Sequence, residues 1–594
     1  MKARWKNNAG RNAVELAGIL VLALLAAWFL HASWRKWPDP IIDSGPQCYN
    51  TWRVSLGALP YHDFHWNYGP LSILCNALLF KCLGPGVMVL AAANLAIYAA
   101  IVALGYLAFR MAWGPLAAFA AGAVFISVFS FSMLNTVGNY NYVLPYSNET
   151  THGMLLILLT AFVMERWCRG PSGATAFLLG LGGGIAVVLK PEFMLATGLL
   201  GLAALFIRCR QHQPPGGREW GWILAGLILP VLLVAAWFAR RESWPAAWVD
   251  SSQAWLAVLV SRSGPGFIDQ SGYDGFNHGW RNLGWELIFS LNAALLLGAI
   301  WAVGWLANRP WRPLLRWIAA LGALALASMF DMGGGFEIGP SFPGLIAVVL
   351  VIFSFRWQRE WRQNGRTQPR TIMALALILL AAAMLTRMVL RARINHFGFI
   401  QAALAGMVLT AVIVAEIPRW TGTGLLGRRI ALLGFLVMLA MGSMAVVTES
   451  AGNHVLQYQP VADGADRFYA FGPAVDETGA VVQWCVERMK TAKPSDTLLV
   501  LPEGVMINYL SRHERPMPEF TDNEPEYIKQ LAQVRPDYVI VIWGDQRDGG
   551  INRFGDPGQP GEKIEQWLRT HYTVEDTRRG RVEWAFVMRQ KPNL

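Results

Sequence analysis

Charged side chains are scarce in this chain of 594 residues. Asp, Glu, Lys and Arg together make up 15% of it, whereas hydrophobic residues make up 54%. An average soluble domain carries about 25% charged residues, and so few charges could not cover the surface of a large soluble protein. The mean hydropathy of +0.34 agrees. The composition therefore indicates a polytopic membrane protein.

Three further absences narrow the function. The six cysteines have neither CxxC nor metal-ligand spacing, so we predict neither a disulfide framework nor a zinc site. Glycines at 180–184 precede Lys190 without a Gly-Lys-Ser/Thr, which excludes a P-loop and favours close helix packing. The net charge of +11 comes without a compact basic tract interleaved with aromatic residues, so we expect no nucleic-acid partner.

Long apolar runs dominate the first three quarters of the chain. About thirteen of them are long enough to cross a bilayer. The first is preceded by basic residues and followed by no small-residue cleavage site, which predicts a retained helix with a cytoplasmic N-terminus. On alternating sides, about twenty Lys and Arg fall in the cytoplasmic loops and roughly half as many in the opposite ones. The runs lie near 13–33, 86–108, 114–133, 150–167, 173–189, 191–208, 220–239, 284–307, 313–330, 338–356, 371–389, 397–416 and 428–448.

The last part of the chain has a different character. Charges become frequent, and short β-like runs at 497–501 and 538–543 alternate with helical patterns near 474–490 and 525–533. Strands alternating with helices are typical of a small α/β domain. We therefore predict a membrane domain over 1–448 and an extracytoplasmic α/β domain over 449–594.

The first external loop, 34–85, holds the most informative acids. Asp43 follows the first helix directly, where a carboxylate is costly to desolvate and tends to be functional. Asp63 comes later in the loop, with Tyr61 and His62 beside it. Folded together, these groups could act as a general base and as ligands of a divalent cation such as Mg²⁺ or Mn²⁺. The alternative is that Asp43 caps a short helix and Asp63 is a solvated loop acid.

Two later segments on the same side offer further candidates. The loop before the helix near 150–167 is rich in Asn, Tyr and hydroxyl groups that could bind a sugar, and its candidates are Asn141, Tyr146, Glu149 and His152. Glu149 could be a third metal ligand, or merely a first-turn acid that complements the helix dipole. Lys190 could bind a phosphate as a point charge while Glu192 orients the acceptor, although an internal Lys–Glu pair is the plain alternative.

A third group of candidates is basic. Arg387, Arg391 and Arg393 lie beside the membrane, also on the external side. Guanidinium groups there could hold a lipid phosphate through charge-assisted hydrogen bonds. Interfacial snorkelling of long side chains is the alternative interpretation.

The first-loop pattern resembles that of a known superfamily. An Asp after the first helix, G-x-x-P-Y-x-D-F over 57–64 and Gly69-Pro70 opening the next apolar stretch resemble the GT-C superfamily of integral-membrane glycosyltransferases. The similarity is greatest to family-39-like bacterial enzymes such as protein O-mannosyltransferases and lipid A aminoarabinose transferases. It extends over roughly 10–450, although the specific motif is confined to about 40–85.

The resemblance implies a GT-C-like helical bundle, short helices along the membrane in the first loop, an outward-facing active site and polyprenyl-phosphate sugars as donors. Asp43 corresponds to the family's first-loop acid, and Glu149 to a further acid often present in a later loop. Ser44 stands where the family frequently has Glu, which bears on the metal requirement.

These observations predict an inverting glycosyltransferase of the bacterial inner membrane, with its C-terminal domain in the periplasm. Asp43 would be the base, Asp63, His62 and Glu149 would hold a cation or orient the acceptor, and Lys190 with the arginines would bind the donor phosphate. The acceptor could be a glycan, a lipid or a protein. Two alternatives are a transporter or flippase of a lipid-linked or anionic solute, and a non-catalytic scaffold of the cell envelope.

Overall fold

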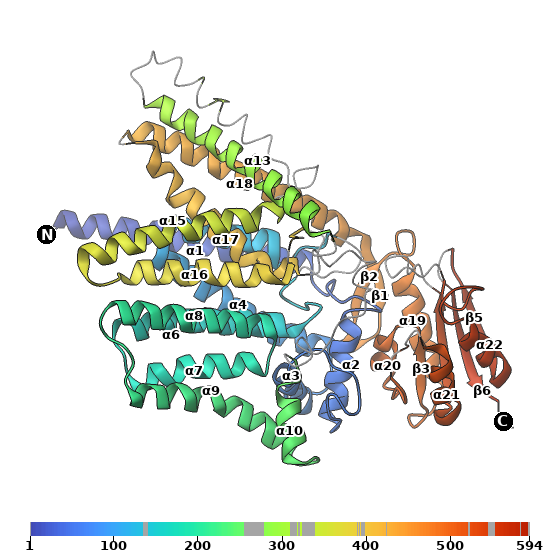
Figure 1. Cartoon of the computed structure of the whole chain (residues 1–594). Coiled ribbons are helices and arrows are strands. Elements are labelled where there is room, and N and C mark those ends of the chain that lie inside the picture. The colour runs from blue at the N-terminus through green and yellow to red at the C-terminus, as the bar shows by residue number, and fades with distance from the viewer. Residues whose placement is uncertain are drawn as a thin grey trace.

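The fold is that of a helical bundle with a small α/β domain at its C-terminal end (Figure 1). The computed structural model describes residues 2–134, 141–254, 278–308, 318, 321–322, 339–388, 390, 392–393, 398–422, 424–518, 520, 523–543, 553–581 and 584–591.

Twelve of the expected apolar runs form helices, and the run at 313–330 lies almost wholly outside the described residues. Among the described residues, nine helices are long and apolar enough to cross a membrane, and three apolar helices are shorter. The prediction of a helical multi-pass membrane protein is therefore confirmed. The helices of this part are α1 (Lys2–Ala32), α2 (Ser44–Ser55), α3 (Pro70–Leu83), α4 (Val87–Trp113), α5 (Pro115–Val124), α6 (Asn148–Arg169), α7 (Gly173–Val187), α8 (Pro191–Arg210), α9 (Gly217–Phe238), α10 (Trp244–Ser251), α13 (Gly279–Ala307), α15 (Phe342–Asn364), α16 (Pro369–Leu385), α17 (Ala403–Ala415) and α18 (Leu425–Leu456).

Burial separates the central helices of the bundle from the peripheral ones. In the most apolar segment of the span that contains α17, 89% of the residues are buried, and in that of α16 72% are. These helices are apolar on all sides because protein surrounds them. In the corresponding segments of α1 and α13, only 11% of the residues are buried. Their exposed leucines and isoleucines are suited to contact with lipid tails, which are as apolar as the side chains themselves.

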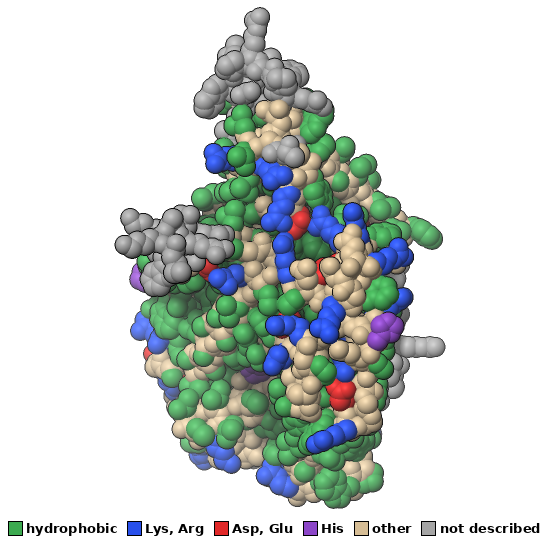
Figure 2. All heavy atoms as spheres, turned by 90° about the vertical axis from the view of Figure 1, so that its left-hand side faces the viewer, with side chains coloured by type: hydrophobic (Ala, Val, Ile, Leu, Met, Phe, Trp, Pro, Cys, Tyr) green, Lys and Arg blue, Asp and Glu red, His purple; other side chains and the backbone are tan. Residues whose placement is uncertain are grey.

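The two ends of the bundle differ in charge. Figure 2 looks onto the end at which α1 begins, and Lys and Arg side chains are spread across it with few acids among them. The end of α15, the connection after it and the start of α16 together contain Arg359, Arg362, Arg366 and Arg370. At the opposite end lie α2, α3, α10 and the C-terminal domain (Figure 1). We call this opposite end the domain end.

The C-terminal domain is a three-layer α/β/α sandwich. Its sheet has the strand order β3-β4-β6-β5, with β3 parallel to β4 and the other pairs antiparallel. Val500 and Ile540 face α19, whereas Leu499 and Val541 face α21 and α22, as the two-residue period of a strand dictates. The prediction of a small α/β domain is confirmed. Its elements are β1 (Gln457–Val461), β2 (Phe468–Phe471), α19 (Thr478–Met489), β3 (Leu498–Leu501), α20 (Val505–Ser511), α21 (Glu524–Val534), β4 (Tyr538–Trp543), α22 (Glu562–His571), β5 (Tyr572–Arg579) and β6 (Trp584–Gln590).

This domain docks on the first external loop. An ideal Cβ on Gly45 of α2 would lie 2.8 Å from the backbone nitrogen of Met506 in α20, so only glycine allows the two helices to approach so closely. Asp466 accepts hydrogen bonds from the backbone N–H of Val87 and the hydroxyl of Tyr509, both at 2.9 Å, and pairs with Arg512 at 2.6 Å. Helix α2 is thus fixed between the bundle and the domain.

Glycines also set the packing of α7 against α9. An ideal Cβ on Gly180 would lie 2.0 Å from the carbonyl oxygen of Ile223, and one on Gly226 would lie 2.1 Å from that of Phe177. Backbone therefore meets backbone at this crossing, as small-residue packing between membrane helices allows. The sequence prediction that Gly180 and Gly184 serve packing agrees with this contact.

Gly226→Ala is expected to lower the free energy of unfolding by about 1–3 kcal/mol, because the added methyl group must push two backbones apart. Gly201→Ala in α8 is the matched control, since an ideal Cβ there meets nothing within 4 Å. The control should be neutral or gain up to about 1 kcal/mol from helix propensity. Thermal unfolding in detergent measures both, and equal melting temperatures would contradict this account of the α7–α9 crossing.

Candidate functional site

The motif of the first loop builds a tight turn. Gly57 has φ +106° and Tyr61 has φ +70°, both in the left-handed region that glycine adopts easily and other residues seldom do. The exposed Asp63 accepts a hydrogen bond from the backbone N–H of Leu59 at 2.7 Å, and Tyr61 donates to the carbonyl of Tyr68 at 2.5 Å. The motif residues therefore determine the shape of the loop and fix the position of Tyr68 within it.

Gly69 joins this loop to the start of α8. Its N–H donates to the carbonyl of Leu189 at 2.8 Å, and the N–H of Leu71 donates to the carbonyl of Val188 at 3.1 Å. An ideal Cβ on Gly69 would lie 2.2 Å from the carbonyl oxygen of Val188. Only glycine fits, and the close approach brings Tyr68 next to Lys190.

Lys190 is buried at the domain end with 3% of its side chain exposed. Its ammonium lies 4.8 Å from the ring centre of Tyr68 and 5.4 Å from that of Tyr146, within the range of cation–π attraction. The Ser147 hydroxyl is 3.5 Å away, and the Glu192 carboxylate, in the first turn of α8, is 3.9 Å away. Two aromatic rings and a hydroxyl therefore surround this cation, and the Glu192 carboxylate lies at the outer limit of an ion pair.

Arg387 comes from the opposite side, just after α16 ends. Its Nε lies 3.3 Å from the same Glu192 oxygen, Oε1, and its guanidinium hydrogen-bonds Tyr146. Glu192 therefore faces two cations. Burial raises the pKa of the Tyr68 phenol well above its ordinary value, so this hydroxyl remains a hydrogen-bond donor at neutral pH.

Glu149 lies beside this pair of cations, fully buried in the first turn of α6. Its Oε2 accepts hydrogen bonds from Ser147 at 2.8 Å and from Gln47 of α2 at 3.5 Å. Its Oε1 has no hydrogen-bond partner among the described residues. A buried carboxylate oxygen without a partner costs free energy, so its presence points to a ligand group that donates to it. We call Tyr68, Tyr146, Ser147, Glu149, Lys190, Glu192 and Arg387 the Lys190 cluster.

Asp43 directly precedes α2, the helix whose Gln47 contacts Glu149 of the cluster. It precedes the first residue of the helix and lies four positions before Gln47, so the two share one face of the helix about one turn apart. Its side chain makes no capping hydrogen bond. The backbone N–H of Asp43 instead donates to the buried carboxylate of Asp39 at 2.6 Å. The half-buried Asp43 side chain therefore does not cap α2, which was the alternative interpretation of this residue.

Four other predicted residues are not part of the Lys190 cluster. Asn141 accepts backbone hydrogen bonds from Val143 and Leu144 within its own turn. His152 bonds the Ser72 hydroxyl at 2.6 Å. Arg393 is exposed, and Arg391 lies outside the described residues.

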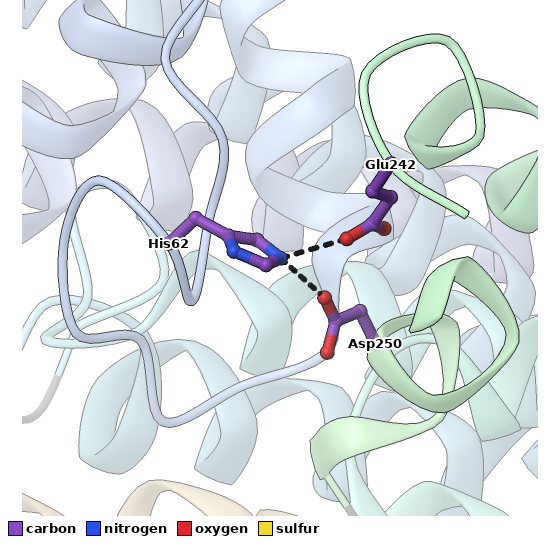
Figure 3. Close-up of side chains that lie close together, drawn as sticks. All are labelled: His62, Glu242 and Asp250. Atoms are coloured by element: carbon purple, nitrogen blue, oxygen red, sulfur yellow. Dashed lines mark hydrogen bonds and ion pairs between the residues drawn. The ribbon is translucent and has the colours of Figure 1, made fainter. Parts of the chain in front are cut away.

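The predicted metal set of Asp43, Asp63 and Glu149 is not assembled. Asp63 is exposed and holds its own turn, whereas Glu149 is buried against Gln47. In the part of the chain that the structure describes, the one group of three possible metal ligands is His62, Glu242 and Asp250 (Figure 3). His62 therefore faces the segment after α9 and the helix α10. A cation requirement of the reaction stays a prediction, and no step below is routed through a metal ion.

Sequence reasoning missed Gln47, Ser147, Glu242 and Asp250. Gln47 could have been found from its spacing, because it lies one helical turn after Asp43. Ser147 is a hydroxyl next to Tyr146 in a loop already recognised as polar. Glu242 and Asp250 pair with His62 across about 180 residues of sequence, and no local pattern signals such a contact.

Comparisons with known proteins give fold similarities only. No protein-family model and no curated protein matches the sequence. The structure is similar to that of ArnT from Cupriavidus metallidurans bound to undecaprenyl phosphate, with 11% identity, a TM-score of 0.45 and coverage of 96% of this chain and 97% of that one. It is also similar to the apo oligosaccharyltransferase of Archaeoglobus fulgidus, with 12% identity, a TM-score of 0.49 and coverage of 98% and 74%. At these scores neither similarity bears on the chemistry of the site.

Glu192→Gln is expected to destabilise the protein by about 3 kcal/mol, because it leaves the Lys190 and Arg387 cations facing each other with no carboxylate between them. Glu487→Gln in α19 is the control, since Glu487 and its partner Lys490 are about half exposed and such pairs contribute under about 1 kcal/mol. Thermal unfolding in detergent compares the two variants. A loss at Glu192 no larger than that at Glu487 would contradict the charge arrangement described here.

Proposed function

We propose that this protein is a membrane glycosyltransferase that moves a sugar from a polyprenyl-phosphate donor to an acceptor hydroxyl at the domain end of the bundle. The observation that carries the proposal is the buried Lys190 ammonium between the rings of Tyr68 and Tyr146. Arg387 shares its Glu192 partner, and one oxygen of Glu149 has no hydrogen-bond partner among the described residues. The resemblance of the first-loop motif to the GT-C superfamily supports the same reaction.

The donor's phosphate fits the two cations. Lys190 and Arg387 both lie near one carboxylate, that of Glu192, so a phosphate that entered between them would meet two cationic groups. Arg387 can offer two parallel N–H groups to phosphate oxygens and Lys190 a point charge. The phenol hydroxyls of Tyr68 and Tyr146 can add hydrogen bonds. The polyprenyl tail would lie along the apolar outside of the bundle, in the membrane.

The transfer itself is a single displacement. The acceptor oxygen attacks the anomeric carbon while the bond from that carbon to the phosphate oxygen breaks, so the sugar is inverted and polyprenyl phosphate leaves. Asp43 takes the proton of the acceptor hydroxyl as the general base. The negative charge that develops on the leaving phosphate is stabilised by Lys190 and Arg387, a form of electrostatic catalysis by preorganised groups.

The acceptor side of the site is assigned to α2 and the start of α6. Glu149 Oε1 can accept a hydrogen bond from a hydroxyl of the sugar or of the acceptor, and Gln47 holds the other oxygen of that carboxylate. We give Asp63 no catalytic step, since its exposed carboxylate fixes the loop turn. The acceptor is a glycan, lipid or protein that reaches the domain end.

The proposed orientation follows from charge. The Arg-rich end in Figure 2 would face the cytoplasm by the positive-inside rule, and the domain end would face the periplasm of a bacterial inner membrane. The reaction would then take place on the outer side of the membrane, which is also the side of the C-terminal domain. A lipid-linked donor would reach the site laterally from the outer leaflet.

A transporter is the less suitable class for these residues. Transporters place their substrate site near mid-membrane, at interrupted helices. Here Lys190 and Glu192 lie at the start of α8, and Arg387 lies in the turn after α16. Charges at helix ends are suited to chemistry at the membrane surface.

Asp43→Asn is expected to lower the release of polyprenyl phosphate by roughly 10²–10⁴-fold, the usual contribution of a general base. The assay offers purified protein a panel of labelled polyprenyl-phosphate sugars with a crude envelope extract as acceptor. Asp463→Asn, an identical change at a side chain that is 81% exposed, is the control and should turn over like the wild type. The proposal fails if no donor is consumed by folded wild-type protein, or if Asp43→Asn turns over like the control.

A further inference from the structure

A histidine and two carboxylates meet away from the Lys190 cluster. Nε2 of His62, in the first external loop, lies 2.7 Å from Oδ2 of Asp250 in α10 and 2.8 Å from Oε2 of Glu242, in the turn between α9 and α10. All three ligand atoms lie within 4.8 Å of one another. Figure 3 shows both carboxylates directed at the same ring nitrogen, from two neighbouring elements.

Hydrogen bonding alone does not satisfy this group. An imidazole nitrogen carries one hydrogen, and the hydrogen bond of His62 goes to Asp250. The Glu242 side chain is only 9% exposed, and neither of its oxygens has a hydrogen-bond partner among the described residues. Apart from its 2.8 Å contact with His62, this carboxylate therefore meets no donor among the described residues, which is a costly arrangement for a side chain that is nine-tenths buried.

Among the described residues, the two arginines next to Glu242 in the sequence hydrogen-bond backbone carbonyls and not this carboxylate. Arg241, the neighbour of Glu242, donates instead to the carbonyl of Gly57 at 2.5 Å. Arg240 donates to the carbonyl of Trp237 at 3.1 Å. With neutral His62 the cluster carries two negative charges, which a divalent cation would balance.

We propose that His62, Glu242 and Asp250 form a zinc site that fastens the first external loop to α10. One imidazole with two carboxylates is a ligand set that Zn²⁺ accepts, with a water molecule in the fourth position, whereas Ca²⁺ and Mg²⁺ prefer oxygen ligands alone. Ligands about 2.0–2.2 Å from a tetrahedral ion lie about 3.4 Å apart. The two distances from His62 need to widen by less than about 1 Å. This movement is open to His62 because its side chain is 47% exposed on a loop.

The site would act on the Lys190 cluster through the loop. Tyr61, the residue before His62, stacks on Phe238 at the end of α9 with 6.1 Å between ring centres and bonds the backbone of Tyr68. A cation at His62 would therefore hold Tyr61, and through it Tyr68, against Lys190. Zinc binding itself does not rest on the proposed glycosyl transfer. Cysteine spacing could not have shown this site, since none of its ligands is a cysteine.

The test measures bound metal in the full chain, purified in detergent without a polyhistidine tag and without any donor. The protein is stripped with a chelator, exchanged into buffer with Zn²⁺, freed of unbound metal and analysed for zinc content and melting temperature. The wild type is expected to retain one zinc ion per chain and to melt at a higher temperature with zinc than after stripping. His62→Gln and Asp250→Asn should lose both effects, with zinc affinity reduced at least tenfold.

His65→Gln is the matched control. His65 lies in the same loop, is exposed and bonds Asn67 rather than an acid, so this variant should retain zinc like the wild type. The proposal is overturned if the wild type retains no zinc, or if all four proteins retain the same amount. Because the readouts involve no sugar, a failed zinc site and a failed transferase assay remain separate results.

Discussion

The Lys190 ammonium is buried where three helices of the bundle meet the first external loop, and burying a charge costs several kcal/mol unless other groups stabilise it. Two tyrosine rings, one hydroxyl and the carboxylate of Glu192 supply that stabilisation. These groups come from three places in the sequence. The position of Lys190 therefore constrains the loop that brings Tyr68, the loop that brings Tyr146 and Ser147, and the end of α16 that brings Arg387.

Close backbone contacts make this convergence possible. Gly69 can approach the carbonyl of Val188 because it has no side chain, and Gly45 approaches Met506 for the same reason. The first contact fixes the loop on the bundle, and the second fixes α2 under the C-terminal domain. Helix α2 carries both Asp43 and Gln47, so the general base that we propose is held from two sides. The C-terminal domain acts through this contact, as a support for α2.

Sequence patterns predicted what depends on local chemistry. Apolar length alone predicted the helices of the bundle, and strand-like runs predicted β3 and β4. Tyr146 and Glu149 were candidates because their loop is rich in Asn, Tyr and hydroxyl groups, and Lys190 because a lysine at the outer end of a helix can bind a phosphate. The strands of the β1–β2 pair were not predicted, since they are short and one contains Pro460.

Long-range pairing was beyond such patterns. Asp43, Asp63 and His62 are near in sequence and were expected to work together, yet the turn at Tyr61 directs His62 toward Asp250 and leaves Asp63 in solvent. Arg387 was recognised only as one of three membrane-flanking arginines, and its pairing with Glu192 could not be read from spacing. Asp39 was not considered at all, although its carboxylate accepts hydrogen bonds from the N–H groups of Ile42 and Asp43, directly before α2.

The central claim is that the Lys190 cluster binds the phosphate of a polyprenyl lipid, and binding without chemistry tests it most directly. Wild-type protein and Lys190→Gln would be titrated in nanodiscs with polyprenyl phosphate and with the uncharged polyprenol of equal length. The account predicts that the wild type binds the phosphate at least tenfold more tightly than the alcohol, because a hydrogen bond to a charged group contributes about 1.5–3 kcal/mol. Lys190→Gln should lose most of that preference while binding the alcohol unchanged. Equal binding of phosphate and alcohol by the wild type would contradict the account.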